Sequence, residues 1–223
     1  ITPSLAEACR SLGDEMYREL AELLESNARE EVYRRALSLL ELMGGNASLS
    51  LAKSVLTNPI PGVKAQALRA MARISPGDPT LLPHFLQCLE DAEPEVRREA
   101  VRGLGTLDDP RSVEALLSIV QGKSAGGGEE HPRVEEAACL ALARLGPERA
   151  LAPLAELLRK KTFALRMRTV HPRVKAAACY ALGQIGGAEV SGLLRAHLDD
   201  SDPIVRNEAR KALAEMRKRG YAE

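Results

Sequence analysis

The 223-residue sequence contains no tryptophan, and all aromatic residues together make up only 3% of the chain. Proteins that stack bases or sugars on aromatic rings need several such side chains, so platforms of this kind are scarce here. The formal net charge is zero, with 31 basic and 31 acidic side chains. A general nucleic-acid binder usually carries a strong basic excess, and we therefore expect no binding to nucleic acid.

Long apolar runs and clustered metal ligands are also missing. No stretch approaches the roughly 20 apolar residues of a membrane-spanning helix, and no secretory signal peptide is visible. The four cysteines, at positions 9, 88, 139 and 179, have no CxxC-type spacing. Their pattern is typical of small buried side chains in a reducing compartment. We expect a cytoplasmic protein that contacts no membrane and holds no metal or cofactor.

What the chain does contain is one apolar pattern that occurs six times. In the clearest copy, Val96, Ala100, Gly103, Leu104 and Leu107 lie on one side of a helix. The first residue of the pattern recurs as Val32, Val63, Val96, Val134, Val174 and Val205, so successive copies are 31 to 40 residues apart. Such periods are typical of a helical solenoid. Each helix that carries the pattern is called a frame helix below.

The first copy of the pattern is the weakest. It consists of Val32, Ala36, Leu39, Leu40 and Met43. We expect these five side chains to form the buried stripe of the first frame helix. In the helix before it, Met16, Leu20, Leu23 and Leu24 are expected to face inward.

A second helix is expected before each frame helix. Proline precedes the pattern valine by one or two residues in five copies, at positions 61, 94, 132, 172 and 203. Proline suits the first position of a helix, and the residue before it, such as Asp202, is a natural N-cap. The expected pairs are 14–24 with 29–43, 47–56 with 63–74, 80–89 with 94–107, 113–120 with 132–145, 150–158 with 172–185, and 190–198 with 203–217. The chain is therefore predicted to be all-α, with about six helix pairs in residues 14–219 and a capping helix in residues 1–13.

Two of the repeats contain insertions at the turn before the frame helix. Residues 121–130 are rich in glycine, which predicts a flexible loop. Residues 160–170 instead alternate apolar Phe163 with basic Arg166 and Arg168 and contain no acidic residue. Equivalent turns of adjacent repeats lie on one edge of a solenoid, so we expect the two insertions to lie side by side.

The repeated motif Pro-x-Val-Arg-x-x-Ala-x-x-Ala-Leu-Gly-x-Ile-Gly, best seen at residues 172–186 and 94–105, resembles the HEAT-repeat family. Within that family it is most similar to the bacterial phycobilin-lyase-type repeats. The resemblance implies a right-handed α-α superhelix, a single solenoid over residues 1–223, with the frame helices on its concave side. It also implies a scaffold or binding module, because the motif residues are packing residues.

Three functional subfamilies of similar architecture can be compared with this sequence. HEAT-like deoxyhypusine hydroxylases carry His-Glu pairs, but the four histidines here are followed by Phe85, Pro132, Pro172 and Leu198. HEAT-like DNA glycosylases use aromatic and acidic residues beside a basic groove, which this composition does not favour. Bilin lyase subunits share the repeat motif, yet no cysteine or histidine stands out for handling a chromophore. We expect no enzyme. The alternative is a subunit of a bilin-lyase-like or chaperone-like enzyme that acts on a cofactor-bearing protein.

Several polar residues have structural interpretations. His131 and His171 occupy the same position of successive copies, where they are expected to be N-caps or loop residues. A column of basic residues follows the pattern valine at Lys64, Arg97, Lys175 and Arg206. It resembles the family's arginine ladder, which implies bonds to acidic turn residues such as Asp91, Asp199 or Asp202.

The remaining candidates are exposed residues that suit the binding of a partner protein. Arg69, Arg73, Arg98, Arg102 and Arg144 are predicted to form a basic centre on the concave side, with Tyr180 on the same face. In the second insertion the candidates are Lys160, Lys161, Phe163, Arg166 and Arg168. An ordinary solvated face, and packing of the loop on its own edge, are the alternatives. The sequence thus predicts a non-catalytic scaffold that binds a protein with an acidic segment, through the concave face and the insertion loops.

Overall fold

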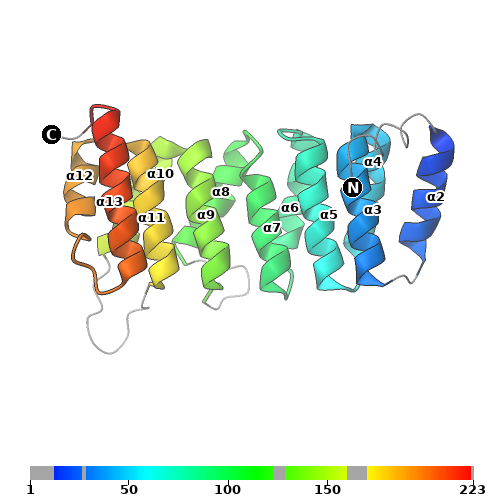
Figure 1. Cartoon of the computed structure of the whole chain (residues 1–223), viewed down its shortest axis with the longest axis horizontal. Coiled ribbons are helices and arrows are strands. Elements are labelled where there is room, and N and C mark those ends of the chain that lie inside the picture. Colours follow the sequence, from blue (N-terminus) through cyan, green and yellow to red (C-terminus); the bar gives the residue numbers. More distant parts are fainter. Residues whose placement is uncertain (1–12, 27–28, 123–128, 160–169, 222–223) are drawn as a thin grey trace. The chain divides into compact units, whose positions relative to one another are not determined.

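A computed structural model of the chain describes residues 13–26, 29–122, 129–159 and 170–221. These residues form helices, turns and connecting segments, and none of them lies in a β-strand. The predicted all-α fold is therefore confirmed. The chain divides into two compact units, residues 1–108 and residues 109–223, which are described separately (Figure 1).

Unit 1 contains three helix pairs among its described residues. They are α2 (Asp14–Glu25) with α3 (Glu30–Met43), α4 (Gly45–Ser54) with α5 (Pro61–Ile74), and α6 (Leu82–Cys88) with α7 (Pro94–Leu104). Two 3₁₀ turns, Val55–Thr57 and Pro79–Leu81, complete the second and third pairs. The frame helices are α3, α5 and α7, and α5 packs against both of the others.

Unit 2 has the same organisation. Its described pairs are α8 (Pro110–Val120) with α9 (Pro132–Leu145), α10 (Pro147–Arg159) with α11 (Pro172–Ile185), and α12 (Ala188–Arg195) with α13 (Pro203–Lys218). The frame helices α9, α11 and α13 form one layer, with α11 packed against both neighbours. The paired helices α8, α10 and α12 form the layer behind them (Figure 1).

The frame pattern makes the core of both units. Five of its six valines, at positions 63, 96, 134, 174 and 205, are at most 1% exposed. Proline begins each of these five helices, as predicted. The predicted cap is also present, since the Asp202 carboxylate accepts a hydrogen bond from the backbone N–H of Ile204 at 2.8 Å. Within each unit, these stripes pack against the neighbouring frame helices of that unit and against the paired helices.

The predicted register of the first frame helix is wrong in part. Val32 and Leu39 are only partly buried, whereas Tyr33 and Leu37 lie in the core. In the buried stripe of α3, Tyr33 and Leu37 thus replace Val32 and Leu39, while Ala36, Leu40 and Met43 are buried as predicted. A physical reason is the large ring of Tyr33, which is 4% exposed while its hydroxyl donates a hydrogen bond to the carbonyl of Ser26. Burying that ring removes more apolar surface from water than burying Val32 would.

Two further details of unit 1 differ from the prediction. Leu23 of α2 was expected to face inward but is 38% exposed. Helix α4 begins at Gly45, two residues earlier than predicted, because Gly44 turns the chain sharply at a φ of 68°. Glycine adopts this left-handed backbone without the steric cost that a Cβ atom would bring.

Three predictions fall wholly or largely outside the described residues. The capping helix expected in residues 1–13 is one, and the two insertions, 121–130 and 160–170, are the others. Of the insertions, the structure describes only 121–122, 129–130 and 170. The buried side chains of Glu130 and Val170 occupy equivalent positions just before the two N-cap histidines. The single solenoid over residues 1–223 stays a prediction.

Close packing between adjacent frame helices depends on a small residue in α11. A Cβ atom on Gly183 would lie 2.6 Å from the Cβ and 3.0 Å from the Cα of Ala212 in α13. The second of these atoms is backbone and cannot move away by a rotamer change. Glycine at this position therefore sets how closely α11 and α13 approach.

We predict that Gly183→Ala destabilises unit 2 by about 1–3 kcal/mol, the usual cost of overpacking. Gly192→Ala is the matched control, because Gly192 is exposed on α12 and a Cβ there meets no atom within 4 Å. It should stabilise the chain by about 0.5–1 kcal/mol through helix propensity. Urea denaturation followed by circular dichroism measures both. Equal effects of the two substitutions would contradict the packing account.

Candidate functional site

The basic column after the pattern valine links successive repeats within each unit. Lys64 of α5 forms an ion pair with Asp91 in the turn before α7. In unit 2, Lys175 of α11 lies 3.5 Å from Asp200 in the turn before α13. Asp91 is thus confirmed as a partner, whereas Asp200 takes the place expected for Asp199 or Asp202.

The arginines of this column donate hydrogen bonds to backbone carbonyls of the preceding turn. Arg97 donates from Nη1 to the carbonyl oxygens of Asp91 and Ala92, both at 2.8 Å. Arg206 makes the equivalent bonds to Asp200 and Ser201, at 2.7 and 2.9 Å. Because all these groups hold turns in place, the column is structural, as the resemblance implied.

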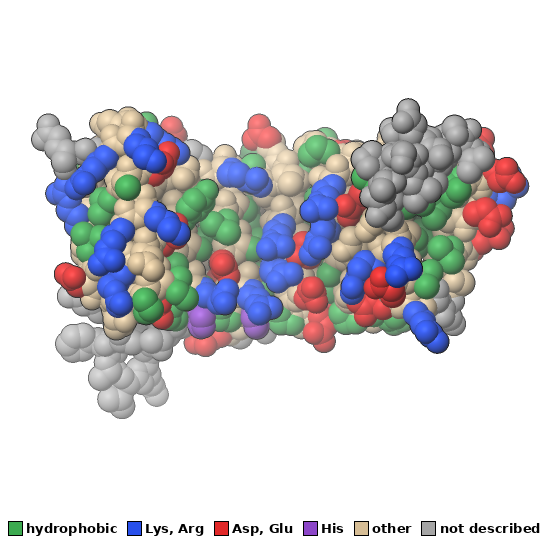
Figure 2. Space-filling model, viewed as in Figure 1, with side chains coloured by type: hydrophobic (Ala, Val, Ile, Leu, Met, Phe, Trp, Pro, Cys, Tyr) green, Lys and Arg blue, Asp and Glu red, His purple; other side chains and the backbone are tan. Residues whose placement is uncertain are grey.

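The next basic residues converge on one buried carboxylate in unit 1. The side chain of Glu99 in α7 is 2% exposed, and its Oε1 accepts hydrogen bonds from three guanidiniums. The donors are Arg69 Nη2 at 3.3 Å, Arg98 Nη2 at 3.0 Å and Arg102 Nη1 at 2.8 Å. We call these four residues the arginine cluster. Figure 2 shows basic side chains gathered over α5 and α7, where the cluster lies.

The ionised state of Glu99 depends on its three partners. Burial alone would raise the pKa of its carboxyl group. The hydrogen bond from Arg69 and the charges of Arg102 and Arg69 outweigh that effect and hold the pKa below its ordinary value. The pKa of Arg69 is raised, chiefly by the same hydrogen bond. One negative carboxylate thus faces three positive guanidiniums, and the four residues together carry a net positive charge.

The other two predicted arginines lie outside the cluster. Arg73 of α5 pairs with Glu41 of α3 at 2.9 Å and is 63% exposed. Arg144 is exposed near the end of α9, in unit 2, and it has interactions of its own. The structure therefore brings Arg69, Arg98 and Arg102 together. Arg73 lies on α5 like Arg69, but its partner is Glu41 of α3.

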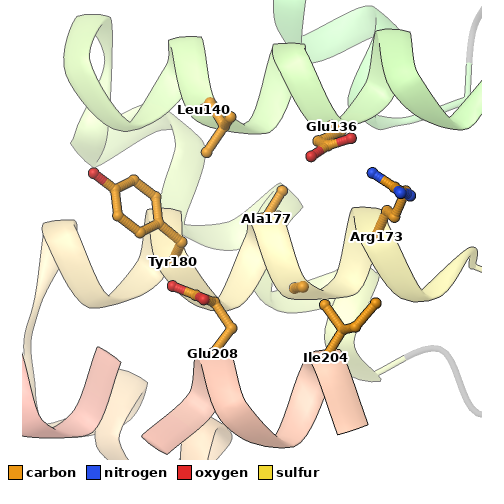
Figure 3. A pocket seen from close by; sticks show the side chains of 8 residues that line it. Glu136, Leu140, Arg173, Ala177, Tyr180, Ile204 and Glu208 are labelled. Carbon is orange, nitrogen blue, oxygen red and sulfur yellow. The ribbon is translucent and has the colours of Figure 1, made fainter. Parts of the chain in front are cut away.

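Tyr180 belongs to a different site, a groove across the three frame helices of unit 2. The groove has a volume of about 320 Å³ and is lined by Leu140 of α9, Tyr180 of α11 and Ile204 of α13. These side chains are 39%, 42% and 52% exposed, respectively. The rest of the lining consists of Glu136, Arg173, Ala176, Ala177 and Glu208. In Figure 3 the Glu136 and Arg173 side chains point toward each other at one end, and Leu140 and Tyr180 lie at the other.

The described histidines and cysteines have structural surroundings. His131 and His171 are N-caps, as expected, and their Nδ1 atoms accept from the backbone N–H of Arg133 and Arg173 at 3.2 Å. Burial raises the pKa of Cys179 to about 12, which leaves its thiol protonated and unreactive near neutral pH. In the part of the chain that the structure describes, no three metal-ligating side chains gather. No helix in that part is long and apolar enough to cross a membrane.

Lys160, Lys161, Phe163, Arg166 and Arg168 lie outside the described residues. Sequence reasoning missed Glu99 and Ile204. A signal for Glu99 was available, since it is the acidic residue inside the basic run Arg97-Arg98-Glu99-Ala100-Val101-Arg102. For Ile204 the signal was a large apolar residue beside the pattern valine, at a position that other copies fill with Gly62, Glu95 or Arg173.

We predict that Glu99→Gln lowers the stability of unit 1 at neutral pH by about 1–3 kcal/mol, because three guanidiniums lose their shared charge partner. The folded-state pKa of Glu99 lies below the ordinary value of 4.5. Its contribution is therefore complete above that value and is lost as the pH falls through the folded-state pKa. The difference between the wild type and the variant should shrink over that acidic range.

Urea denaturation at a series of pH values measures this difference. Glu31→Gln is the control, because Glu31 is 54% exposed and forms surface ion pairs with Arg34 and Arg35 on α3. Its effect should stay within about 0.5 kcal/mol. A Glu99→Gln difference that stays constant between neutral and acidic pH would contradict the assigned ionisation.

The repeats and the fold of the chain are both similar to those of known proteins. The sequence profile of HEAT repeats matches residues 82–171 and 164–214, which together span more than half of the chain. No curated protein is significantly similar in sequence. An engineered protein solved by a structural genomics consortium is 21% identical with a TM-score of 0.50, over 95% of this chain and 60% of that one. At this identity the likeness concerns the fold alone.

Two other solved structures are more distant. Human deoxyhypusine hydroxylase in complex with glycerol is 17% identical with a TM-score of 0.46, and the match covers 94% of this chain and 98% of that one. A designed armadillo repeat protein is 18% identical with a TM-score of 0.46, over 89% and 98% of the two chains. The extent of the profile match decides the family: the chain belongs to the HEAT-repeat proteins.

Proposed function

We propose that the chain is a non-catalytic scaffold that binds a partner protein through the exposed faces of its frame helices. The observation that carries this proposal is the groove of unit 2. Three successive frame helices each contribute one large, exposed apolar side chain to it, namely Leu140, Tyr180 and Ile204. Exposed apolar groups that line one groove are typical of protein-interaction sites.

These side chains have no evident duty in the fold. The stripes that hold unit 2 together run through Val134, Val174 and Val205, which are fully buried on the same three helices. Polar residues at these three positions would leave that packing in place. They would also expose less apolar surface to water, and such exposure is unfavourable. Tyrosine is also enriched at the centre of protein interfaces, where its ring buries a large area with little loss of side-chain entropy.

The occupant that suits the groove is an apolar side chain on a segment of the partner. A volume of about 320 Å³ lies at the lower end of the range for ligand pockets and suits one or two side chains. Glu136, Arg173 and Glu208 provide charged groups at the rim for polar contacts around such an anchor. The arginine cluster of unit 1 supports the second part of the proposal, a partner that carries an acidic segment.

The compartment that we propose for this interaction is the cytoplasm. Among the described residues, Cys88, Cys139 and Cys179 are free thiols. Free cysteines of this kind fit a reducing environment.

Photo-crosslinking at position 180 tests the binding face. With benzoylphenylalanine in place of Tyr180, irradiation in the source cell should give an adduct with one discrete protein. The same probe at Ala152, an exposed residue on the paired helix α10, is the matched control and should not give that adduct. Equal adducts from both positions would contradict a specific face.

The partner identified in this way should then bind the purified chain. We predict that Tyr180→Ala weakens this binding at least tenfold, because a central interface tyrosine typically contributes about 2 kcal/mol or more. The far-ultraviolet circular dichroism should not change, since Tyr180 is not part of the buried stripe. Unchanged affinity of the variant, or turnover of a substrate by the purified chain alone, would overturn the proposal.

A further inference from the structure

The arginine cluster contains more positive charge than the fold requires. Arg69 of α5 is the residue that links Glu99 to a neighbouring frame helix. Arg98 and Arg102 lie on α7 itself, so their bonds to Glu99 add no link between helices. One arginine would suffice to neutralise the buried carboxylate. The other two need an explanation beyond packing.

Glu99 holds the three guanidiniums close together. Their nearest nitrogen atoms lie 2.8, 3.0 and 3.3 Å from the same Oε1 atom. No two of these nitrogens are therefore more than about 6 Å apart, a distance at which like charges repel appreciably near a protein surface. Two other carboxylates act on the cluster, namely Glu95, which lies 3.6 Å from Arg98, and Glu41, which is paired with Arg73. An additional anion at this place would relieve the repulsion.

Several donors in the cluster are still unused. A guanidinium has five N–H groups. Arg69 and Arg98 each bind Glu99 through Nε and Nη2, and Arg102 does so through Nη1. Within the described part of the chain, Nη1 of Arg69, Nη1 of Arg98, and both Nε and Nη2 of Arg102 donate no hydrogen bond to protein. Arg102 is also 54% exposed and Arg69 36%, so an incoming group can reach them.

We propose that Arg69, Arg98 and Arg102, positioned by Glu99, form an oxyanion-binding site for a carboxylate or phosphate group carried by a partner's protein segment. Guanidinium forks match both groups through paired N–H bonds. The buried carboxylate orients the arginines before the ligand arrives, which reduces the entropy lost on binding. This inference rests on the proposed scaffold function and assigns a chemistry to its acidic partner segment.

Peptide binding by the purified full chain tests this site. The probes are a short glutamate-rich peptide, the same peptide with phosphoserine at the glutamate positions, and a neutral peptide with glutamine there. Fluorescence anisotropy at low salt should show binding of at least one anionic peptide and none of the neutral one. The stronger of the two anionic peptides identifies the carboxylate or the phosphate as the preferred group. Affinity should fall as salt is added.

Two variants of equal charge separate the site from general electrostatics. Arg102→Gln should weaken binding of the preferred peptide at least fivefold. Arg34→Gln removes the same charge from unit 1 at an arginine of similar exposure, 56%, on α3, and should change the affinity less than twofold. Arg102→Lys keeps the charge but loses the fork, and should lie between the wild type and Arg102→Gln. Thermal melting verifies that all variants are folded.

Equal weakening by Arg102→Gln and Arg34→Gln, or no binding of either anionic peptide, would overturn the inference. These outcomes are distinct from failure of the proposed function, which is decided at Tyr180 in the other unit. A partner captured at position 180 that binds Arg102→Gln with full affinity would leave the scaffold standing and remove the oxyanion site. If Arg102→Gln loses peptide binding but no adduct forms at position 180, the oxyanion site would stand and the scaffold proposal at the groove would fall.

Discussion

Burial of one apolar stripe per frame helix is the constraint on which the rest of the structure depends. A lone helix pair cannot cover this stripe, so the frame helices within each unit pack side by side. In unit 1, α5 packs against α3 and α7, and in unit 2, α11 packs against α9 and α13. Proline at the helix start, glycine where helices approach closely, and the ladder of Lys64 and Asp91 all serve this stacking. The opposite side of each frame helix takes no part in this apolar packing.

Sequence reasoning could predict the elements that repeat. The valine stripe and the proline starts recur in five copies, and periodicity makes each copy support the others. The prediction failed where one copy differs, as in α3, because the ring of Tyr33 competes with Val32 for the core. It failed at Leu23 for a related reason: α2 offers more apolar residues than its contacts with neighbouring helices bury.

The candidate sites were harder to predict, because they depend on which exposed side chains meet. Periodicity placed Arg69, Arg98 and Arg102 on the exposed face, but only the structure shows that they share Glu99. The groove likewise needs three helices from three repeats, and Ile204 has no counterpart in the other copies that would mark it. A net charge of zero was also misleading as a guide to local charge, since it averages the arginine cluster with acidic surface elsewhere.

In the binding mode that we propose, the partner covers the frame helices and leaves the paired helices exposed to solvent. Hydrogen–deuterium exchange of the chain, alone and saturated with its purified partner, measures this most directly. We expect added protection in α9, α11 and α13 of unit 2 and in α5 and α7 of unit 1, with exchange in α8, α10 and α12 unchanged. Protection confined to the paired helices would contradict the account.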